Sequence, residues 1–419
     1  MTESALAPAP TSAVTRIASS HLVLWGAFAL VHLGLGLLNL YADNQPLGDV
    51  TSVYKFWMQT ALDGGVWVGI DTVWVYPVLA LVPMIASTVL GLDNIGSTWL
   101  TLVMVLNAVA FGFLSGWGRS RGSLAPAWWW LGFLALLGPI AMGRIDSITV
   151  PIALVGVLLL ASRPSAAALL LTVATWIKVW PAALVAAALI ALRDRSKVLA
   201  AAAIGSAAIV VGALLLGAGP NVLSFVTQQT GRGLQIESPI STIWMWMAAA
   251  GYAHVDYDRV ILTYQVYGPG DDTAAALMTP VLAIVVLAIL VLGLLATRRG
   301  VSATDLFPPL ALALTVALIA FNKVGSPQFV GWLAVPIIAG LVTSAVGHGR
   351  SFRTPATIAL VIAGLTQLIY PYFYNYLLWV NPLMLTVLTA RNALYFVLLA
   401  WAIVSVVRST PSIRLKEKS

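Results

Sequence analysis

The sequence has no cysteine, few histidines and few charged residues. The absence of cysteine excludes disulfides, cysteine-ligated metals and thiol catalysis. The four histidines, His21, His32, His254 and His348, are scattered along the chain without the spacing of metal ligands. Only 9% of the 419 residues are charged, whereas a soluble domain averages about 25%. These absences predict no metal site and argue against a soluble protein.

The residues that are abundant are apolar. They make up 60% of the chain, and apolar runs of about 20 residues recur to its end. This pattern predicts an all-α polytopic membrane protein with about 11–12 transmembrane helices. The formal net charge of +7 does not indicate a nucleic-acid partner. More than half of the lysines and arginines lie in the predicted cytoplasmic loops and tails, where the positive-inside rule places them.

Both ends of the chain are predicted to be cytoplasmic. Residues 1–20 are rich in Ala, Pro, Ser and Thr and are typical of a disordered tail, and residues 408–419 form a basic tail. Between them, residues 21–407 are predicted to form the membrane domain. The first span, Leu22–Leu40, exceeds the apolar core of about 7–15 residues of a cleaved signal peptide, so we expect a retained helix.

Two long polar loops, residues 41–72 and 219–273, carry an excess of acidic residues and are predicted to be extracytoplasmic. We expect residues 73–90 to form the second span and residues 166–192 to form one long span. The segments within residues 126–162 are near the lower limit for crossing a membrane, so half-helices and tilted helices are both open there.

Three arginines do not fit this topology. Arg119, Arg121 and Arg163 fall on the extracytoplasmic side, where the positive-inside rule disfavours them. They are the exceptions that a structure has to explain.

Asp49 is the first candidate for chemistry. It follows Gly48 in the first extracytoplasmic loop, just before Val53–Met58, whose mixed aromatic, apolar and basic residues predict a short helix in the membrane interface. A carboxylate there can act as a general base on a sugar hydroxyl. The alternative is a structural aspartate that caps the next helix. On chemistry alone, Asp43 and Asp63 compete for the same role.

A late polar turn and the second loop supply candidate substrate contacts. Asn322, Lys323 and Gln328 place a cation and amides at the end of a span, where Lys can hold a lipid phosphate. The alternative is a helix-terminating turn with a snorkelling lysine. In the second loop, Arg232 is a candidate to pair with a phosphate, and Glu237 is a candidate to hydrogen-bond sugar hydroxyls. The alternative there is an internal Arg232–Glu237 pair.

Three further ionisable residues lie near membrane depth. Lys178 precedes Pro181 inside an apolar run, and such cations are either paired or functional. It is a candidate phosphate or substrate contact, and a structural role in the helix is the alternative. Arg144 and Asp146 form a further polar pair, and a salt bridge between Asp146 and Lys178 is a guess without a spacing argument.

These pieces resemble a known family when they are taken in order. The motifs are Gly48-Asp49-Val50 with Val53-Tyr54, Val75-Tyr76-Pro77, Gly143-Arg144-Ile145-Asp146, Lys178-Val179-Trp180-Pro181, Arg232 to Ser238, and Asn322-Lys323-Val324 with Ser326-Pro327-Gln328. The series resembles the actinobacterial polyprenol-phosphate-mannose-dependent mannosyltransferases of the GT-C fold. That family includes the phosphatidylinositol-mannoside and lipomannan α-1,2-mannosyltransferases.

The resemblance implies a multi-pass enzyme of the plasma membrane with an extracytoplasmic active site. Asp49 would be the catalytic base, and Tyr54 would join the substrate-binding candidates. The donor would be a polyprenyl-phosphate sugar, the acceptor a glycolipid, and the protein a monomer that needs no cofactor. Many members of the family have Gly-Gln-Ile-Asn where this chain has Gly143-Arg144-Ile145-Asp146.

Two other functions stay open. An arabinofuranosyltransferase that uses decaprenyl-phosphate arabinose would need the same residue types. A lipid or solute transporter would place its polar residues at mid-membrane, and Lys178 and Arg391 keep that alternative open. The larger polar loops lie on one side and no tandem repeat is evident, so we favour the enzyme.

Overall fold

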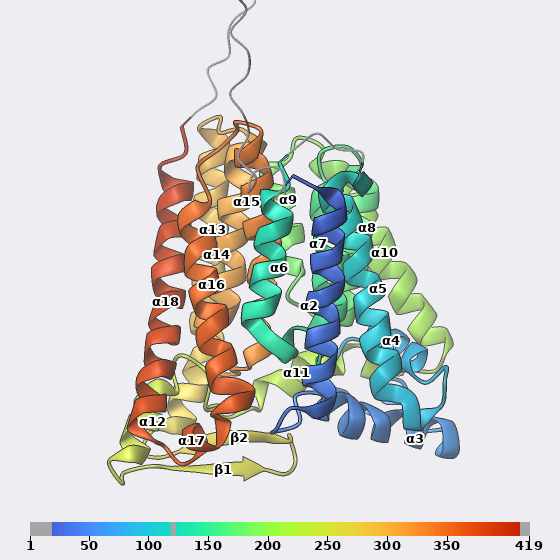
Figure 1. The fold of residues 1–419 in the computed structure, drawn as a ribbon, viewed down its shortest axis with the longest axis vertical. Helices are drawn as coiled ribbons and strands as arrows, with labels where there is room; N and C mark the ends of the chain where they lie inside the picture. The colour runs from blue at the N-terminus through green and yellow to red at the C-terminus, as the bar shows by residue number, and fades with distance from the viewer. Residues whose placement is uncertain (1–18, 119–122, 411–419) are drawn as a thin grey trace, which may run out of the picture.

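The apolar runs of the sequence become helices that lie side by side in one bundle (Figure 1). The computed structural model describes residues 19–118 and 123–410. Most of both predicted tails, together with Arg119 and Arg121, lies outside the described residues. Within them, eight helices are long and apolar enough to cross a membrane, and five apolar helices are shorter. The predicted class, an all-α polytopic membrane protein, is confirmed.

The long helices are α2 (His21–Tyr41), α5 (Ile95–Ser115), α10 (Arg195–Leu215), α13 (Asp271–Arg298), α14 (Ala303–Ala320), α15 (Ala334–Ala345, with the 3-10 helix Pro327–Leu333 before it), α16 (Arg353–Gln367, with the π-helix Leu368–Tyr372 after it) and α18 (Pro382–Val407). The short apolar helices are α4 (Leu81–Ser87), α6 (Ala125–Leu137), α7 (Asp146–Leu159), α8 (Pro164–Ile177) and α9 (Ala182–Ala191).

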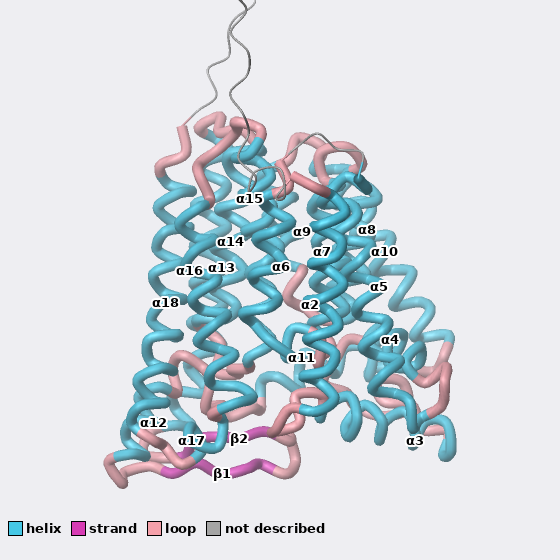
Figure 2. The backbone as a smooth tube through the Cα atoms, viewed as in Figure 1, coloured by secondary structure: helices cyan, strands magenta, loops and turns pink. Residues whose placement is uncertain are grey.

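The described chain begins and ends at the same end of the bundle, which we name the terminal end (Figure 1). The opposite end, the loop end, carries further short elements, and Figure 2 shows its two strands. These elements are the π-helix Asp49–Tyr54, α3 (Lys55–Gly64), α11 (Ser224–Thr230), α12 (Thr242–Ala249), the antiparallel strands β1 (His254–Asp258) and β2 (Thr263–Tyr267), and α17 (Tyr374–Leu378).

The first span is an integral part of the bundle. Leu24 and Phe28 of α2 are buried, and the ring of Trp25 meets Phe111 of α5 edge to face with 5.1 Å between centroids. These contacts make the first span part of the packed core of the bundle.

The prediction that residues 73–90 form the second span is wrong. This stretch forms a 3-10 turn, Val78–Ala80, and the seven-residue α4, which is about 10 Å long and too short to cross a membrane. Pro77 and Gly91 flank the helical part and limit its length. The chain therefore enters α5 from the loop end, where Lys55 pairs with Asp93 at 3.0 Å.

The prediction that residues 166–192 form one long span is also wrong. It is broken into α8 and α9 by an extended residue, Lys178, and Pro181 begins the second helix. Pro181 has no amide hydrogen and cannot continue α8. The two helices form a hairpin, because the Ile190 carbonyl near the end of α9 accepts a hydrogen bond from Thr297 at the terminal end.

These two corrections resolve the position of Arg163. Asp146 begins α7 and Lys178 follows α8, and the two residues pair with each other. Each helix has 14 residues, about 21 Å of rise, so the turn that holds Arg163 lies far from this pair, at the terminal end. Arg163 thus joins the other basic residues of that end and is no exception.

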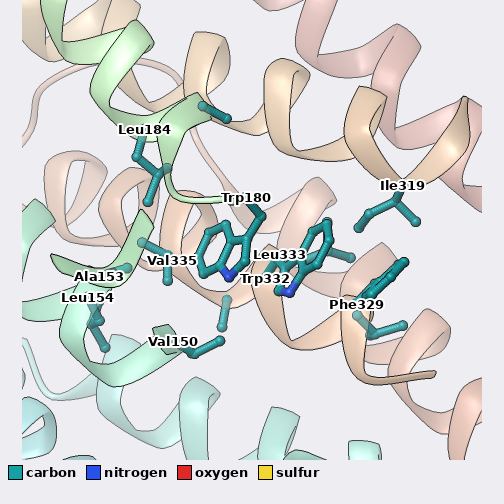
Figure 3. Packing of buried hydrophobic residues seen from close by; sticks show 14 of the residues in the cluster. Val150, Ala153, Leu154, Trp180, Leu184, Ile319, Phe329, Trp332, Leu333 and Val335 are labelled. Atoms are coloured by element: carbon teal, nitrogen blue, oxygen red, sulfur yellow. The ribbon is translucent and has the colours of Figure 1, made fainter. Parts of the chain in front are cut away.

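A stack of aromatic rings joins the break between α8 and α9 to the turn before α15. Trp180, between α8 and α9, stacks on Trp332 with 5.5 Å between ring centroids. Phe329 stacks on the other side of Trp332 at 4.3 Å. Figure 3 shows this stack with Val150 and Val335 around it. The buried stack fixes the two breaks relative to each other.

The loops of the loop end form one packed layer. The Gln235 amide donates to the Lys323 carbonyl at 3.0 Å, and the Val266 amide donates to the Leu234 carbonyl at 3.0 Å. A Cβ atom at Gly325 would overlap the backbone of Glu237 and Ser238. The late turn and the second loop are therefore in backbone contact, although about 90 residues separate them in the sequence.

This contact predicts the effect of a small substitution. Gly325→Ala should cost at least about 1–3 kcal/mol, because backbone has to move to admit the methyl group. Gly231→Ala is the matched control, because a Cβ there meets nothing within 4 Å. Thermal unfolding of the purified variants in detergent checks the difference. Equal unfolding temperatures for both variants would contradict the observed packing.

Candidate active site

A large cavity opens at the loop end of the bundle. Its volume is about 1080 Å³, at the upper end of the range of about 300–1,000 Å³ typical of ligand sites. The predicted site residues that line it are Asp49, Tyr54, Arg144, Lys178, Arg232, Glu237, Asn322, Lys323 and Gln328. Asp146 lies behind the wall and is 2% exposed. Segments from across the sequence thus meet at one site.

Asp49 is the first residue of the π-helix Asp49–Tyr54, and its carboxylate is partly exposed. It makes no helix-capping bond, because neither this helix nor α3 has a side-chain cap. Its Oδ2 instead lies 3.0 Å from Nε of Arg144. The capping alternative is therefore wrong. The competing residues Asp43 and Asp63 are not in the cavity wall.

Arg144 joins three segments of the chain. Besides Asp49, its guanidinium donates to the Pro46 carbonyl at 2.6 Å and to the Tyr370 hydroxyl at 3.1 Å. The chain approaches Pro46 closely because Gly143 precedes Arg144; a Cβ at Gly143 would lie 2.7 Å from the Pro46 oxygen. Arg144 thus fixes the first loop, and with it the carboxylate of Asp49, against the bundle.

The guessed salt bridge between Asp146 and Lys178 is confirmed. Nζ of Lys178 lies 3.7 Å from one carboxylate oxygen of Asp146, and Trp332 donates to the other at 2.7 Å. The ammonium also lies over the ring of Tyr76, 4.6 Å from its centroid. The helix break therefore places Lys178 in the cavity wall, while Asp146 and an aromatic ring stabilise its charge.

Glu237 is paired with a residue outside its own loop. Arg391 of α18 donates to the Glu237 carboxylate at 2.8 Å and to the Glu237 carbonyl at 2.7 Å, and it also contacts Asn392. Burial raises the pKa of Glu237, and Arg391 opposes that shift. The alternative of an Arg232–Glu237 pair is wrong. Glu237 anchors the second loop to α18 while one side of it faces the cavity.

Arg232 and Lys323 add positive charge to the same cavity. Burial lowers the pKa of both side chains. Nε of Arg232 is buried without a hydrogen-bond partner among the described residues. Lys323 is 5% exposed and so does not snorkel to the surface. Together with Lys178, these residues give the cavity a wall that suits an anion.

Sequence reasoning missed most of the aromatic lining. Tyr54, Trp57, Trp74 and Tyr76 form one cluster, in which Trp57 and Trp74 meet edge to face at 5.4 Å. A second group includes Tyr264 of the β-hairpin. The hairpin had a signal in the sequence, because alternating aromatic and polar residues flank a short connection at residues 259–262.

The fold and the cavity define a class of protein. Two carboxylates, four cations and many aromatic rings line one space at one end of the helical bundle. A base for a hydroxyl, cations for a phosphate and rings for sugars can act together there. Most of the cavity wall comes from segments of the loop end, and this favours an enzyme with a membrane-borne substrate over a transporter.

Comparison with known families supports this class. Residues 74–238 match the model of glycosyltransferase family 87. The matched range contains Arg144, Asp146, Lys178 and Glu237 but ends well before Lys323. It covers less than half of the chain and indicates a membrane glycosyltransferase. No curated protein and no solved structure matches the chain significantly.

The buried pair of Glu237 and Arg391 predicts a large loss of stability. Glu237 is 3% exposed and Arg391 1%, so Glu237→Gln leaves an uncompensated buried charge and should cost about 3–5 kcal/mol. Asp194→Asn is the control, because the exposed pair of Asp194 and Lys197 is worth at most about 1 kcal/mol. Thermal unfolding in detergent measures both. A shift for Glu237→Gln no larger than that of the control would contradict the prediction.

Proposed function

We propose that the chain is an inverting glycosyltransferase that moves mannose from a polyprenyl-phosphate donor to a glycolipid acceptor. The observation that carries the proposal is the shared cavity, which has Asp49 in its wall together with Lys178, Arg232 and Lys323. The family match supports the transferase class. The motif series described above supports the choice of mannose and of a phosphosugar donor.

The acidic residue Asp49 and the basic residues of the cavity have different roles in the proposed reaction. Asp49 takes the proton from an acceptor hydroxyl, whose oxygen forms a bond to the anomeric carbon of the donor sugar. The bond between that carbon and the phosphate oxygen breaks at the same time. The polyprenyl phosphate leaves as an anion without protonation, stabilised by Arg232 and Lys323. Lys178 and Tyr76 lie beside the same space and contact the donor head group.

Charge distribution supports an orientation in the membrane. Basic residues predominate at the terminal end, which includes Arg163, Arg299 and Arg353, and acidic residues predominate at the loop end. The positive-inside rule then places the terminal end in the cytoplasm. The cavity faces the extracytoplasmic side of the plasma membrane, and α3 lies along that surface. Both lipid substrates reach the site from this leaflet.

The role of Asp49 is tested by a substitution that keeps its shape. Asp49→Asn should lower kcat by at least about 10²–10⁴-fold, because the amide cannot accept the proton. Transfer of radiolabelled mannose from polyprenyl-phosphate mannose to glycolipids in membranes measures this loss. Asp43→Asn and Asp63→Asn are matched controls in the same loop but outside the cavity wall. Near-normal transfer by Asp49→Asn would reject the assignment.

Arg144 is proposed as the residue that positions Asp49. Arg144→Gln removes the contact with Asp49 and should lower kcat by about 10²-fold, as expected for misplacement of a catalytic group by about 1 Å. The KM for the donor should change little. Lys55→Gln is the control, because it breaks an ion pair of the same segment outside the cavity. Unchanged kcat in Arg144→Gln would show that Asp49 does not depend on this contact.

A further inference from the structure

Four tyrosines form a continuous series of ring contacts along one side of the cavity. Tyr257 and Tyr264 lie 4.9 Å apart between ring centroids, Tyr264 and Tyr374 6.1 Å, and Tyr370 and Tyr374 5.1 Å. All four line the cavity. We name this set the tyrosine wall. It combines residues of the β-hairpin with residues of the segment after α16.

The hairpin holds its two tyrosines in fixed positions. Tyr257 of β1 and Tyr264 of β2 are directly opposite in the antiparallel register, so their side chains share a face. The Tyr264 carbonyl accepts a hydrogen bond from the Ile236 amide at 3.3 Å, which ties the strand to the second loop. The wall is therefore part of the packed layer of the loop end rather than a free loop.

The tyrosine wall leads to the proposed catalytic base. Tyr370 accepts a hydrogen bond from Arg144 at 3.1 Å, and Arg144 contacts Asp49 at 3.0 Å. At the other end of the series, burial raises the pKa of the Tyr257 hydroxyl, and the negative charge of Asp49 adds to that shift. Arg144 thus links one end of the wall to the carboxylate, and the other end lies within its electrostatic reach.

The chemistry of the wall differs from that of the cationic side. Lys178 lies over Tyr76, which belongs to the other aromatic cluster, and Tyr76 also interacts electrostatically with Arg232. The wall itself offers ring faces and phenolic hydroxyls without a net charge. Ring faces pack against the C–H surfaces of a sugar, and hydroxyls exchange hydrogen bonds with its hydroxyls. A neutral, hydroxyl-rich ligand fits there better than a phosphate.

We infer that the tyrosine wall is the subsite for the acceptor glycan and directs an acceptor hydroxyl toward Asp49. This inference rests on the proposed function and adds the location and chemical class of the acceptor. The phosphosugar donor then occupies the cationic side around Tyr76, and the acceptor the opposite side of Asp49. The size of the cavity allows both to be bound at once.

Truncation of one tyrosine tests the subsite. Tyr257→Ala removes a ring that is 39% exposed, so the core stays intact. The KM for the glycolipid acceptor should rise about two- to tenfold, the change expected when one aromatic contact is lost. The KM for the donor should stay unchanged. Tyr267→Ala is the matched control, because Tyr267 lies on the same hairpin, packs on His254 and does not line the cavity.

A binding measurement separates this inference from the proposed function. Calorimetric titration of purified protein with octyl mannoside and octyl mannobioside requires no catalysis. The account predicts that Tyr257→Ala weakens binding of the mannobioside and that Tyr267→Ala does not. Equal binding and equal acceptor KM in the two variants would overturn the tyrosine wall, whether or not transfer occurs. Absence of transfer by the wild type, with intact and Tyr257-dependent glycan binding, would instead overturn the proposed reaction.

Discussion

The ion pair between Asp49 and Arg144 is the contact on which the site depends. It joins the first loop to the segment between α6 and α7, and the same guanidinium reaches Pro46 and Tyr370. One arginine can serve three partners because its donors form a planar fork. Without it, the first loop would lose the polar contacts of Pro46 and Asp49 with the bundle. The carboxylate would then lose its fixed direction toward the cavity.

Interrupted helices make room for this chemistry inside a membrane protein. A continuous helix satisfies its own backbone and leaves no space for polar groups, whereas breaks are tolerated where they line a cavity. Lys178 lies at such a break, and the stack of Trp180 on Trp332 holds that break against the turn before α15. The cost of a buried lysine is offset by Asp146 and Tyr76.

The sequence predicted the class of the fold and the charged residues of the cavity wall, because polar residues are conspicuous in an apolar chain. It did not predict that residues 73–90 and 166–192 fail to form single continuous spans. Residues 73–90 are apolar enough, but Pro77 and Gly91 leave only a short helix. It also could not pair Glu237 with Arg391, because that contact joins a loop to a helix more than 150 residues later. The β-hairpin was missed because its strands are short and partly exposed.

The central claim is that sugar transfer takes place beside Asp49, between the cationic side and the tyrosine wall. A cryo-EM structure with a non-hydrolysable phosphonate analogue of polyprenyl-phosphate mannose tests it most directly. The account predicts the phosphonate at Arg232 and Lys323 and the anomeric carbon about 3–3.5 Å from a bound acceptor oxygen next to Asp49. Density for the analogue outside the cavity, or with its sugar remote from Asp49, would contradict the account.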